Sequence, residues 1–226
     1  MNKQENENIA VIFDMDGVII DSNPLITRAW KDFFAAHGVA LSDEQLRQYV
    51  FGRTVNDTLT MVLDRQPTKN EIAKCEAEVN GNVKRLYQAE GRIVDGFTPF
   101  VKSLIENDIL VAIATSAPPE NVNIVLQLAG AEHYFTIISN ASHVKHSKPH
   151  PEIYLTTAER LKVDPARCVV FEDSFSGIQS ARSAGMKVIG VTTTHSDEEF
   201  AGLTDDNVSD FTVLSVAEVK ELVAQQ

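Results

Sequence analysis

The chain has 226 residues, 43% of them hydrophobic and 23% charged, which is enough apolar material for one large packed domain or two smaller ones. A formal net charge of −12 argues against a general binder of nucleic acids or anionic membranes, but a local cation could still hold a small anionic ligand. The two cysteines form no CxxC pair, which favours a reducing compartment. The start MNKQENEN lacks a signal peptide's apolar stretch, and no segment approaches the ~20 apolar residues of a membrane span. We therefore expect a soluble, cytoplasmic protein.

The first predicted element is a buried strand at residues 9–13, and it stops abruptly at Asp14, Asp16 and Gly17. This placement needs a reason, because an unpaired ionised carboxylate is unfavourable away from water. Helical periodicity follows at residues 23–38, 42–50, 55–63 and 68–89. The last of these helices is polar, and we expect the run Asn80-Gly81-Asn82 to break it. We expect no strand in this block.

From residue 94 the pattern alternates between helices and strands. Helices are predicted at 99–106, 120–128, 152–161, 176–184 and from 216; strands are predicted at 109–114, 136–138, 168–171, 188–191 and 212–214. Alternation of this kind predicts an α/β fold, a doubly wound, Rossmann-like parallel sheet with helices on both faces. The expected core domain is formed by residues 1–22 and 93–226, and residues 23–92 form an inserted α-helical cap domain. Ligands bind at the carboxyl ends of strands in such sheets, where a helical lid would exclude water.

Polar side chains follow several of the predicted strands. They are Asp14 and Asp16, Thr115 and Ser116, and Glu172 and Asp173, with Lys148 in the loop before a helix. Three or more carboxylates at one sheet edge need a compensating cation, and Mg²⁺ takes oxygen ligands while keeping waters for a substrate phosphate. Taken singly, the aspartates could instead end a strand and cap a helix, and the lysine could be a solvated loop residue.

Four segments in this order and spacing, DMDGVIIDS, ATS, SKP and FEDSFSGIQSARSAG, resemble the four motifs of haloacid dehalogenase-superfamily phosphotransferases. The helical insert resembles the small cap of the subgroup that holds β-phosphoglucomutase-like proteins and sugar-phosphate phosphatases. The resemblance implies a Mg²⁺-dependent phosphatase, acting on a small phosphorylated metabolite such as a sugar or polyol phosphate through an aspartyl-phosphate. It also implies a monomer or weak homodimer with no nucleic-acid or membrane partner.

The resemblance also assigns roles to individual residues. Asp14 would be the nucleophile, and Asp16 the general acid/base. Thr115 would hydrogen-bond the transferring phosphoryl group, and Lys148 would neutralise its oxygens. The implied metal ligands are Asp14, the backbone carbonyl of Asp16, Asp173, and Glu172 directly or through water. The implied substrate-binding residues are Gly17, Arg53, Ser116 and Ala117.

Three other functions compete with the phosphatase. A β-phosphoglucomutase-type mutase is the runner-up, but the histidine and arginine that the resemblance implies for a mutase cap are replaced here by Ile26 and Val55. A dehalogenase is disfavoured because that branch lacks the second aspartate, here Asp16. A binding module with an inactive site is disfavoured because no catalytic position is substituted. The six histidines show no metal-like spacing, and we expect His146 and His150 on the loop surface.

Overall fold

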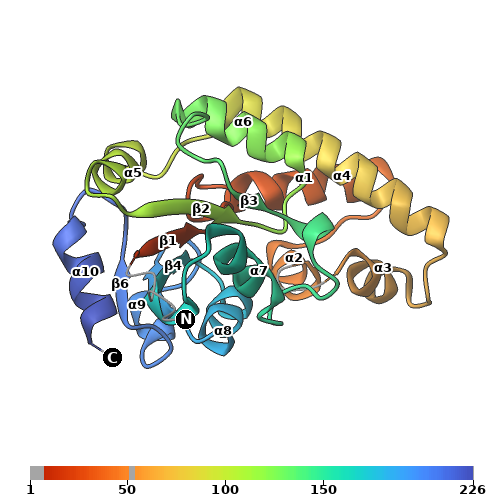
Figure 1. The fold of residues 1–226 in the computed structure, drawn as a ribbon. Helices are drawn as coiled ribbons and strands as arrows, with labels where there is room; N and C mark the ends of the chain where they lie inside the picture. The colour runs from red at the N-terminus through yellow and green to blue at the C-terminus, as the bar shows by residue number, and fades with distance from the viewer. Residues whose placement is uncertain (1–7, 51–53, 226) are drawn as a thin grey trace. The chain divides into compact units, whose positions relative to one another are not determined.

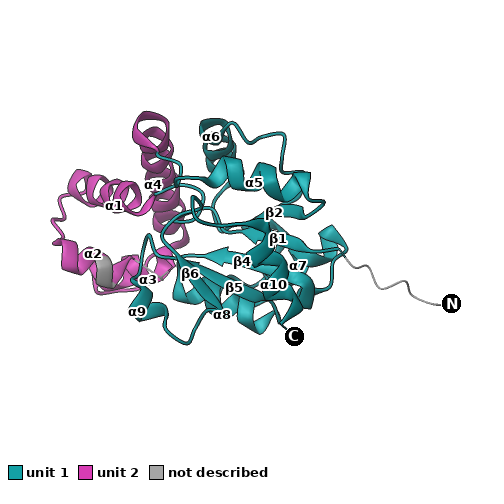
Figure 2. Ribbon diagram, turned by 90° about the vertical axis from the view of Figure 1, so that its left-hand side faces the viewer, with its two compact units in different colours: residues 1–21, 92–226 teal, residues 22–91 magenta. Residues whose placement is uncertain are grey.

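The computed structural model describes residues 8–50 and 54–225 and divides the chain into two compact units (Figure 2). One unit is formed by Met1–Asp21 together with Arg92–Gln226, and the other by Ser22–Gly91. The first contains the sheet and the second is helical. A cap function for the helical unit stays a prediction. No helix among the described residues combines the length and the hydropathy required to cross a membrane.

A parallel sheet organises the first unit (Figure 1). Its strands are β1 (Ala10–Phe13), β2 (Leu110–Ala114), β3 (Ile138–Ser139), β4 (Cys168–Glu172), β5 (Lys187–Val191) and β6 (Asp206–Val208), in the order β3-β2-β1-β4-β5-β6. In the register of the central strands, Phe13 lies level with Ile113 on β2 and with Phe171 on β4. The residues that follow these three strands therefore meet at one edge. The predicted α/β fold is confirmed.

Helices cover both faces of this sheet. The helices of the unit are α5 (Phe97–Glu106), α6 (Pro119–Ala129), α7 (Glu152–Leu161), α8 (Phe175–Ser183), α9 (Asp197–Phe200) and α10 (Val216–Ala224), with short 3₁₀ turns η1 (Ala141–His143) and η2 (Pro165–Arg167). On one face, α7 and α8 pack against the strands through a core that includes Ile12, Tyr154 and Ile178. On the other, α5 and α10 pack over β2 and β4.

The alternation of side chains along β1 separates the two cores. Ile12 points to the face covered by α7 and α8, whereas Phe13 lies in a cluster of aromatic rings on the opposite face. The Phe13 ring stacks on Phe171 at a centroid distance of 5.2 Å and meets Phe97 edge-to-face at 5.3 Å. Both faces of the central strand are buried, as expected for a parallel sheet.

The predicted strand at residues 212–214 is wrong, and the last strand is β6. An aspartate side chain just before this segment diverts its backbone, because Asp210 Oδ1 accepts from the Thr212 amide at 2.8 Å and also from its hydroxyl. Val213 is left 72% exposed. Phe211 is the buried anchor of the segment, and its amide donates to the Asp95 carbonyl at 2.9 Å. Asp side chains favour such local turns over sheet pairing.

The helical unit contains α1 (Asn23–Ala36), α2 (Asp43–Tyr49), α3 (Val55–Leu63) and α4 (Lys69–Glu90). Helix α1 packs against α4 and buries Trp30, which stacks on Phe34 at 5.6 Å. The expected break at residues 80–82 is wrong, because α4 runs through them. Val79 and Val83, four residues apart, are both buried. Packing of that face outweighs the glycine's helix penalty of about 1 kcal/mol.

Candidate active site

Three strand ends bring the predicted site residues together in the first unit. Asp14 follows β1, Thr115 follows β2, and β4 ends at Glu172, with Asp173 next. The Asp14 amide donates to the Phe171 carbonyl and the Thr115 amide to the Ser139 carbonyl, both at 3.0 Å, so these residues stay tied to the neighbouring strands. The side chains named here are buried. A rigid sheet thus positions three carboxylates and a hydroxyl.

Lys148 reaches this edge from the loop between η1 and α7. Its ammonium donates to Asp14 Oδ1 at 2.7 Å, to Glu172 Oε1 at 2.6 Å and to the Ala114 carbonyl at 3.3 Å. Its Nζ also lies 4.9 Å from the centre of the Tyr154 ring. Only 8% of the lysine side chain is exposed. Although Lys148 lies in a loop, charge-assisted hydrogen bonds in a buried setting hold its side chain in place.

Glu172 organises the centre of the site. Its Oε1 accepts from Lys148 and from the Tyr154 hydroxyl, the latter at 2.8 Å. Its Oε2 accepts from the amides of Asp173 and Ser174 at 3.0 and 3.1 Å, and from the Ser174 hydroxyl. Both oxygens are therefore engaged, and a direct bond from Glu172 to a metal would compete with these donors.

The buried carboxylates carry more negative charge than Lys148 can balance. Oxygens of Asp14, Glu172 and Asp173 all lie within 4.8 Å of one another. Three carboxylates facing one ammonium leave an excess of two negative charges when all are ionised. A hard divalent cation with oxygen ligands fits this donor set and this charge. The Thr194 hydroxyl donates a short hydrogen bond to Asp173 Oδ2 and orients that carboxylate.

Burial shifts the protonation equilibria of the site. It raises the pKa of Asp14 well above the usual range, against the opposing effect of Lys148, and the neighbouring carboxylates add to the rise. Burial by itself would lower the pKa of Lys148, but Asp14 and Glu172 hold it well above its ordinary value. Burial, and then Glu172, raise the pKa of Tyr154, which therefore stays a neutral donor. A cation bound at the carboxylates would favour ionised Asp14.

Two glycines leave room for the carboxylates. Gly17 has a φ of +76°, which favours glycine, and a Cβ at this position would overlap the Asp173 carboxylate. Gly177, in the first turn of α8, would place a Cβ within the carboxylate group of Glu172. Neither position accommodates a larger residue without moving a candidate metal ligand.

The sequence as a whole matches a known family. A family model for haloacid dehalogenase-like hydrolases matches residues 11–191. The chain belongs to this family. The family predicted from the four motifs is thereby confirmed, and the two strand-end aspartates and the lysine lie within the matched range.

Relatives of this haloacid dehalogenase-like hydrolase include named phosphatases. The phosphorylated carbohydrates phosphatase of Thermotoga maritima is 33% identical over 189 residues, covering 83% of this chain and 87% of that protein. Hexitol phosphatase B of Escherichia coli K12 is 30% identical over 217 residues, covering 93% and 96%. Among solved structures, a family hydrolase from Entamoeba histolytica has a TM-score of 0.89 at 27% identity, covering 96% of this chain and 99% of that one. A β-phosphoglucomutase from Clostridium difficile has a TM-score of 0.81 at 25% identity, covering 96% and 97%.

The remaining predicted site residues of this family member lie around the cluster. Asp16 is half-buried in the tight turn after β1, where the Gly17 amide donates to the Ile20 carbonyl at 2.9 Å. Ser116 is exposed beside Thr115, whereas the amide of buried Ala117 donates to Thr115 Oγ1 at 3.0 Å. Arg53 lies outside the described residues. The roles assigned to all of these residues stay predictions.

Several residues of the site were missed by sequence reasoning. Tyr154 lies inside an ordinary amphipathic helix pattern, so nothing in the sequence distinguishes it from a core residue. Thr194 lies in the loop after β5, and its contact with Asp173 depends on the sheet order. Gly177 carried a usable signal, because glycine is unfavourable in the first turn of a helix unless space is needed there.

Proposed function

We propose that this protein is a Mg²⁺-dependent phosphatase that hydrolyses a small phosphorylated carbohydrate through an aspartyl-phosphate. The observation that carries the proposal is the arrangement of Asp14, with one oxygen bound by Lys148, beside the carboxylates of Glu172 and Asp173. The two relatives named as phosphatases of phosphorylated carbohydrates and hexitols support the reaction and the substrate class.

The proposed reaction has two displacements. An Asp14 oxygen attacks phosphorus, the bond from phosphorus to the substrate oxygen breaks, and Asp16 gives that oxygen a proton. Water then attacks the aspartyl-phosphate, Asp16 takes a proton from the water, and the bond to Asp14 breaks to release inorganic phosphate. Asp16 returns to its starting protonation state, so the cycle consumes only water and substrate.

The surrounding residues position and neutralise the reacting groups. Lys148 holds Asp14 and would offer its charge to the phosphoryl oxygens, while the Thr115 hydroxyl would donate to one of them. Asp14, Asp173 and the carbonyl of Asp16 would hold Mg²⁺, with Glu172 directly or through water. A bound Mg²⁺ would offset the repulsion between the nucleophile and the substrate phosphate. Gly17 and Ser116 would lie against the phosphate, and Arg53 would bind another part of the substrate.

A phosphosugar mutase is the second candidate, because the backbone also matches a β-phosphoglucomutase. Such an enzyme must protect its aspartyl-phosphate from water while the sugar reorients. The positions where the resemblance implies a histidine and an arginine hold the apolar residues Ile26 and Val55. We therefore expect hydrolysis to dominate. Incubation with β-glucose 1-phosphate and a trace of glucose 1,6-bisphosphate separates the two, since a mutase isomerises faster than it releases phosphate.

The primary experiment measures turnover of p-nitrophenyl phosphate and of a panel of sugar and polyol phosphates. Mg²⁺ should support turnover and excess EDTA should abolish it. Asp14→Asn should be inactive yet folded, because an amide is a poor nucleophile. Asp21→Asn is the matched control, since Asp21 is exposed and lies on the same segment. Substantial activity in Asp14→Asn, or full activity in EDTA, would refute the proposed mechanism.

Two buried cysteines bear on where the enzyme works. Cys75 and Cys168 form no disulfide, and burial raises the pKa of each thiol to about 12. Thiols that stay protonated and unpaired suit a reducing compartment. We place the enzyme in the cytoplasm as a monomer or weak homodimer. Light scattering over a range of protein concentrations measures its oligomeric state.

A further inference from the structure

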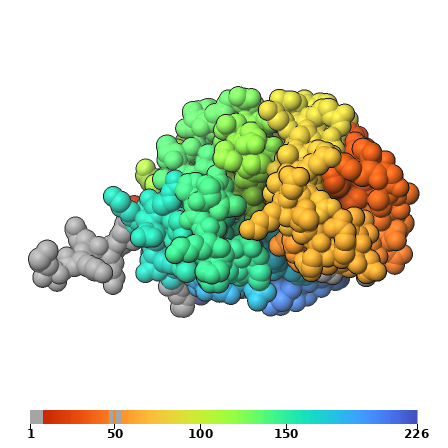
Figure 3. Space-filling view, turned by 90° about the vertical axis from the view of Figure 1, so that its right-hand side faces the viewer, coloured from red at the N-terminus to blue at the C-terminus, as the bar shows by residue number. Residues whose placement is uncertain are grey.

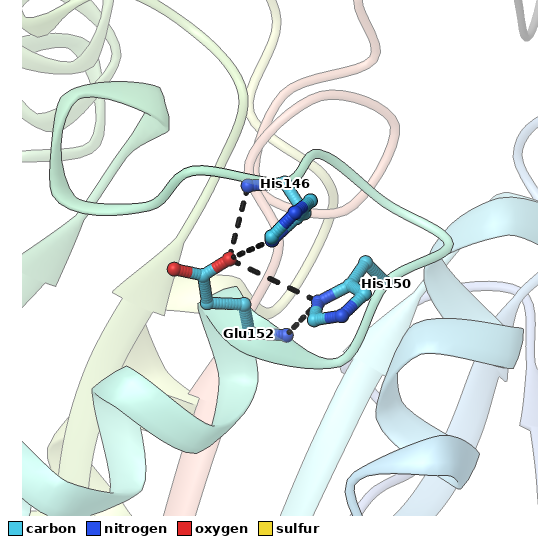
Figure 4. Close-up of side chains that lie close together, drawn as sticks. All are labelled: His146, His150 and Glu152. Carbon is cyan, nitrogen blue, oxygen red and sulfur yellow. Dashed lines mark hydrogen bonds and ion pairs between the residues drawn. The ribbon is translucent and has the colours of Figure 1, made fainter.

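A second group of metal-binding side chains lies on the loop that carries Lys148 (Figure 4). It consists of His146, His150 and Glu152, and one potential ligand atom from each lies within 4.8 Å of the others. His146 Nδ1 lies 2.8 Å from Glu152 Oε2, and His150 Nδ1 lies 3.9 Å from the same oxygen. From the sequence we expected no metal-like spacing among the histidines, and we expected His146 and His150 on the loop surface.

The carboxylate of this group is fixed before any ligand binds. Glu152 Oε1 accepts from the Lys145 amide at 3.0 Å, and Oε2 accepts from the His146 amide at 2.9 Å. These backbone hydrogen bonds, first that of Lys145, and the contact with the His146 ring lower the pKa of Glu152 to about 2. The group therefore presents a fixed carboxylate that is ionised at neutral pH.

The two imidazole rings lie together, and the backbone of His150 is held in place. Their ring centroids lie 4.4 Å apart, and the carbonyl of His150 accepts from the buried hydroxyl of Ser180 at 2.7 Å. The amide of His150 donates to the Ser147 carbonyl at 3.0 Å. Both rings are at least half exposed, and the stretch around residue 150 belongs to the molecular surface in Figure 3. An ion from solvent therefore has direct access to three positioned donors.

We propose that His146, His150 and Glu152 bind a borderline transition metal ion of the Zn²⁺, Co²⁺ or Ni²⁺ type. Two imidazole nitrogens and one carboxylate are the donor set that such ions prefer over Mg²⁺. A tetrahedral ion with bonds near 2.0–2.1 Å separates its ligand atoms by about 3.3 Å. The distances of 2.8 and 3.9 Å to Glu152 Oε2 lie on either side of this value. A water would take the fourth position.

Metal binding at His146 requires a change of tautomer, with no net release of a proton. In the absence of an ion, the short distance between His146 Nδ1 and Glu152 Oε2 places a hydrogen on the ring nitrogen. When the ion binds both atoms, Nδ1 gives up its hydrogen to solvent and Nε2 takes one up, so the imidazole ligand stays neutral. His150 Nδ1, which accepts from the Glu152 amide at 3.3 Å, must release this long hydrogen bond.

This site differs from the carboxylate cluster in its donors and in its exposure, but the two are linked through the chain. His146 and His150 stand two residues on either side of Lys148, whose ammonium contacts Asp14. An ion that joins both histidines would restrain the segment that carries the lysine. This coupling, unlike binding itself, rests on the proposed catalytic role of Lys148.

The test is calorimetric titration of Zn²⁺ into the whole protein in saturating Mg²⁺, which is added to occupy the carboxylate cluster. Wild type should bind one equivalent of Zn²⁺. His150→Ala should weaken the affinity by at least about 10–100-fold, because losing a residue that only supports a metal ligand already costs that much and His150 is itself a ligand. His150→Ala retains the contact between His146 and Glu152, so the loop keeps its attachment to α7. His133→Ala removes an exposed histidine elsewhere and should bind Zn²⁺ like wild type.

A spectroscopic readout identifies the ligands independently of activity. Paramagnetic Co²⁺ in saturating Mg²⁺ should broaden the imidazole NMR signals of His146 and His150 more strongly than those of the other four histidines. Absence of stoichiometric binding in wild type, unchanged affinity in His150→Ala, or broadening of other histidines instead would overturn the site. If Zn²⁺ binds as expected but changes phosphatase turnover equally in wild type and in His150→Ala, the coupling to Lys148 is wrong and the site stands.

Discussion

Replacing Gly177 by alanine should damage this protein, although alanine is the better helix former. Gly177 is in the first turn of α8, and an added Cβ would lie within the carboxylate of Glu172. That carboxylate is fully buried and bound by Lys148, Tyr154 and two backbone amides. These partners hold the carboxylate where the methyl group would lie, so the methyl group must displace it or shift α8.

The magnitude follows from three opposing contributions. Alanine gains at most about 1 kcal/mol over glycine in a helix. Overpacking a rigid site costs about 1–3 kcal/mol, and losing one hydrogen bond to a charged group costs about 1.5–3 kcal/mol more. The expected net loss of unfolding free energy is about 1.5–5 kcal/mol. Displacement of Glu172 also removes one of the three acceptors that hold Lys148, and a shift of about 1 Å in such a group lowers kcat on the order of 10²-fold.

Gly81 provides the matched control. It also lies within a helix, α4, but a Cβ there meets nothing within 4 Å. Gly81→Ala should therefore raise stability by about 1 kcal/mol. The single tryptophan, Trp30, is buried in the helical unit and reports its unfolding by fluorescence, while circular dichroism follows Gly177→Ala. Turnover of p-nitrophenyl phosphate is measured for both variants.

The two substitutions should have opposite signs, and this contrast tests the steric explanation. If Gly177→Ala proved as stable and as active as wild type, the close approach between Gly177 and Glu172 would not constrain the site. If both variants lost stability equally, a general intolerance of these helices to Gly→Ala substitution would explain the result better than contact with the carboxylate.

Three further predictions concern other parts of the molecule. Tyr154→Phe removes a hydrogen-bond donor to Glu172, so it should lower the unfolding free energy, measured with denaturant, by about 1.5–3 kcal/mol. It should also lower kcat more than it changes KM, and a change in KM alone would contradict a positioning role for Tyr154. Thr68→Ala removes the N-cap of α4 and should cost about 1 kcal/mol, read from Trp30 fluorescence; no change would show that packing against α1 suffices. The hydrogen bond from Arg65 lowers the pKa of Glu71 from 4.5 to about 2. The ionised Glu71 therefore contributes its full stabilisation above about pH 4.5, and this stabilisation is lost as the pH falls toward 2. The difference in unfolding free energy between wild type and Glu71→Gln should shrink over that pH interval, and a difference independent of pH would refute the role of this ion pair.

Much of the fold could be predicted because it depends on local patterns. Strands β1, β2, β4 and β5 are largely apolar runs, and the helices between them show regular periodicity, so their existence follows from short segments. The expected strand at residues 212–214 and the expected break at residues 80–82 are wrong for the opposite reason. At residues 212–214, the Asp210 side chain accepts a backbone amide hydrogen bond that a strand would give to its neighbour. At residues 80–82, packing of Val79 and Val83 outweighs the low helix propensity of Gly81.

The sequence by itself determined the family and which residues follow the strands, because an ordered set of four motifs is specific and parallel strands end at one edge. Only the tertiary structure decided how these residues bind one another. Tyr154 reaches Glu172 from another element, and Gly177 makes room for that carboxylate. The group of His146, His150 and Glu152 forms because a turn brings a loop back to the start of α7. Distances between side chains depend on how elements pack, and no local pattern encodes them.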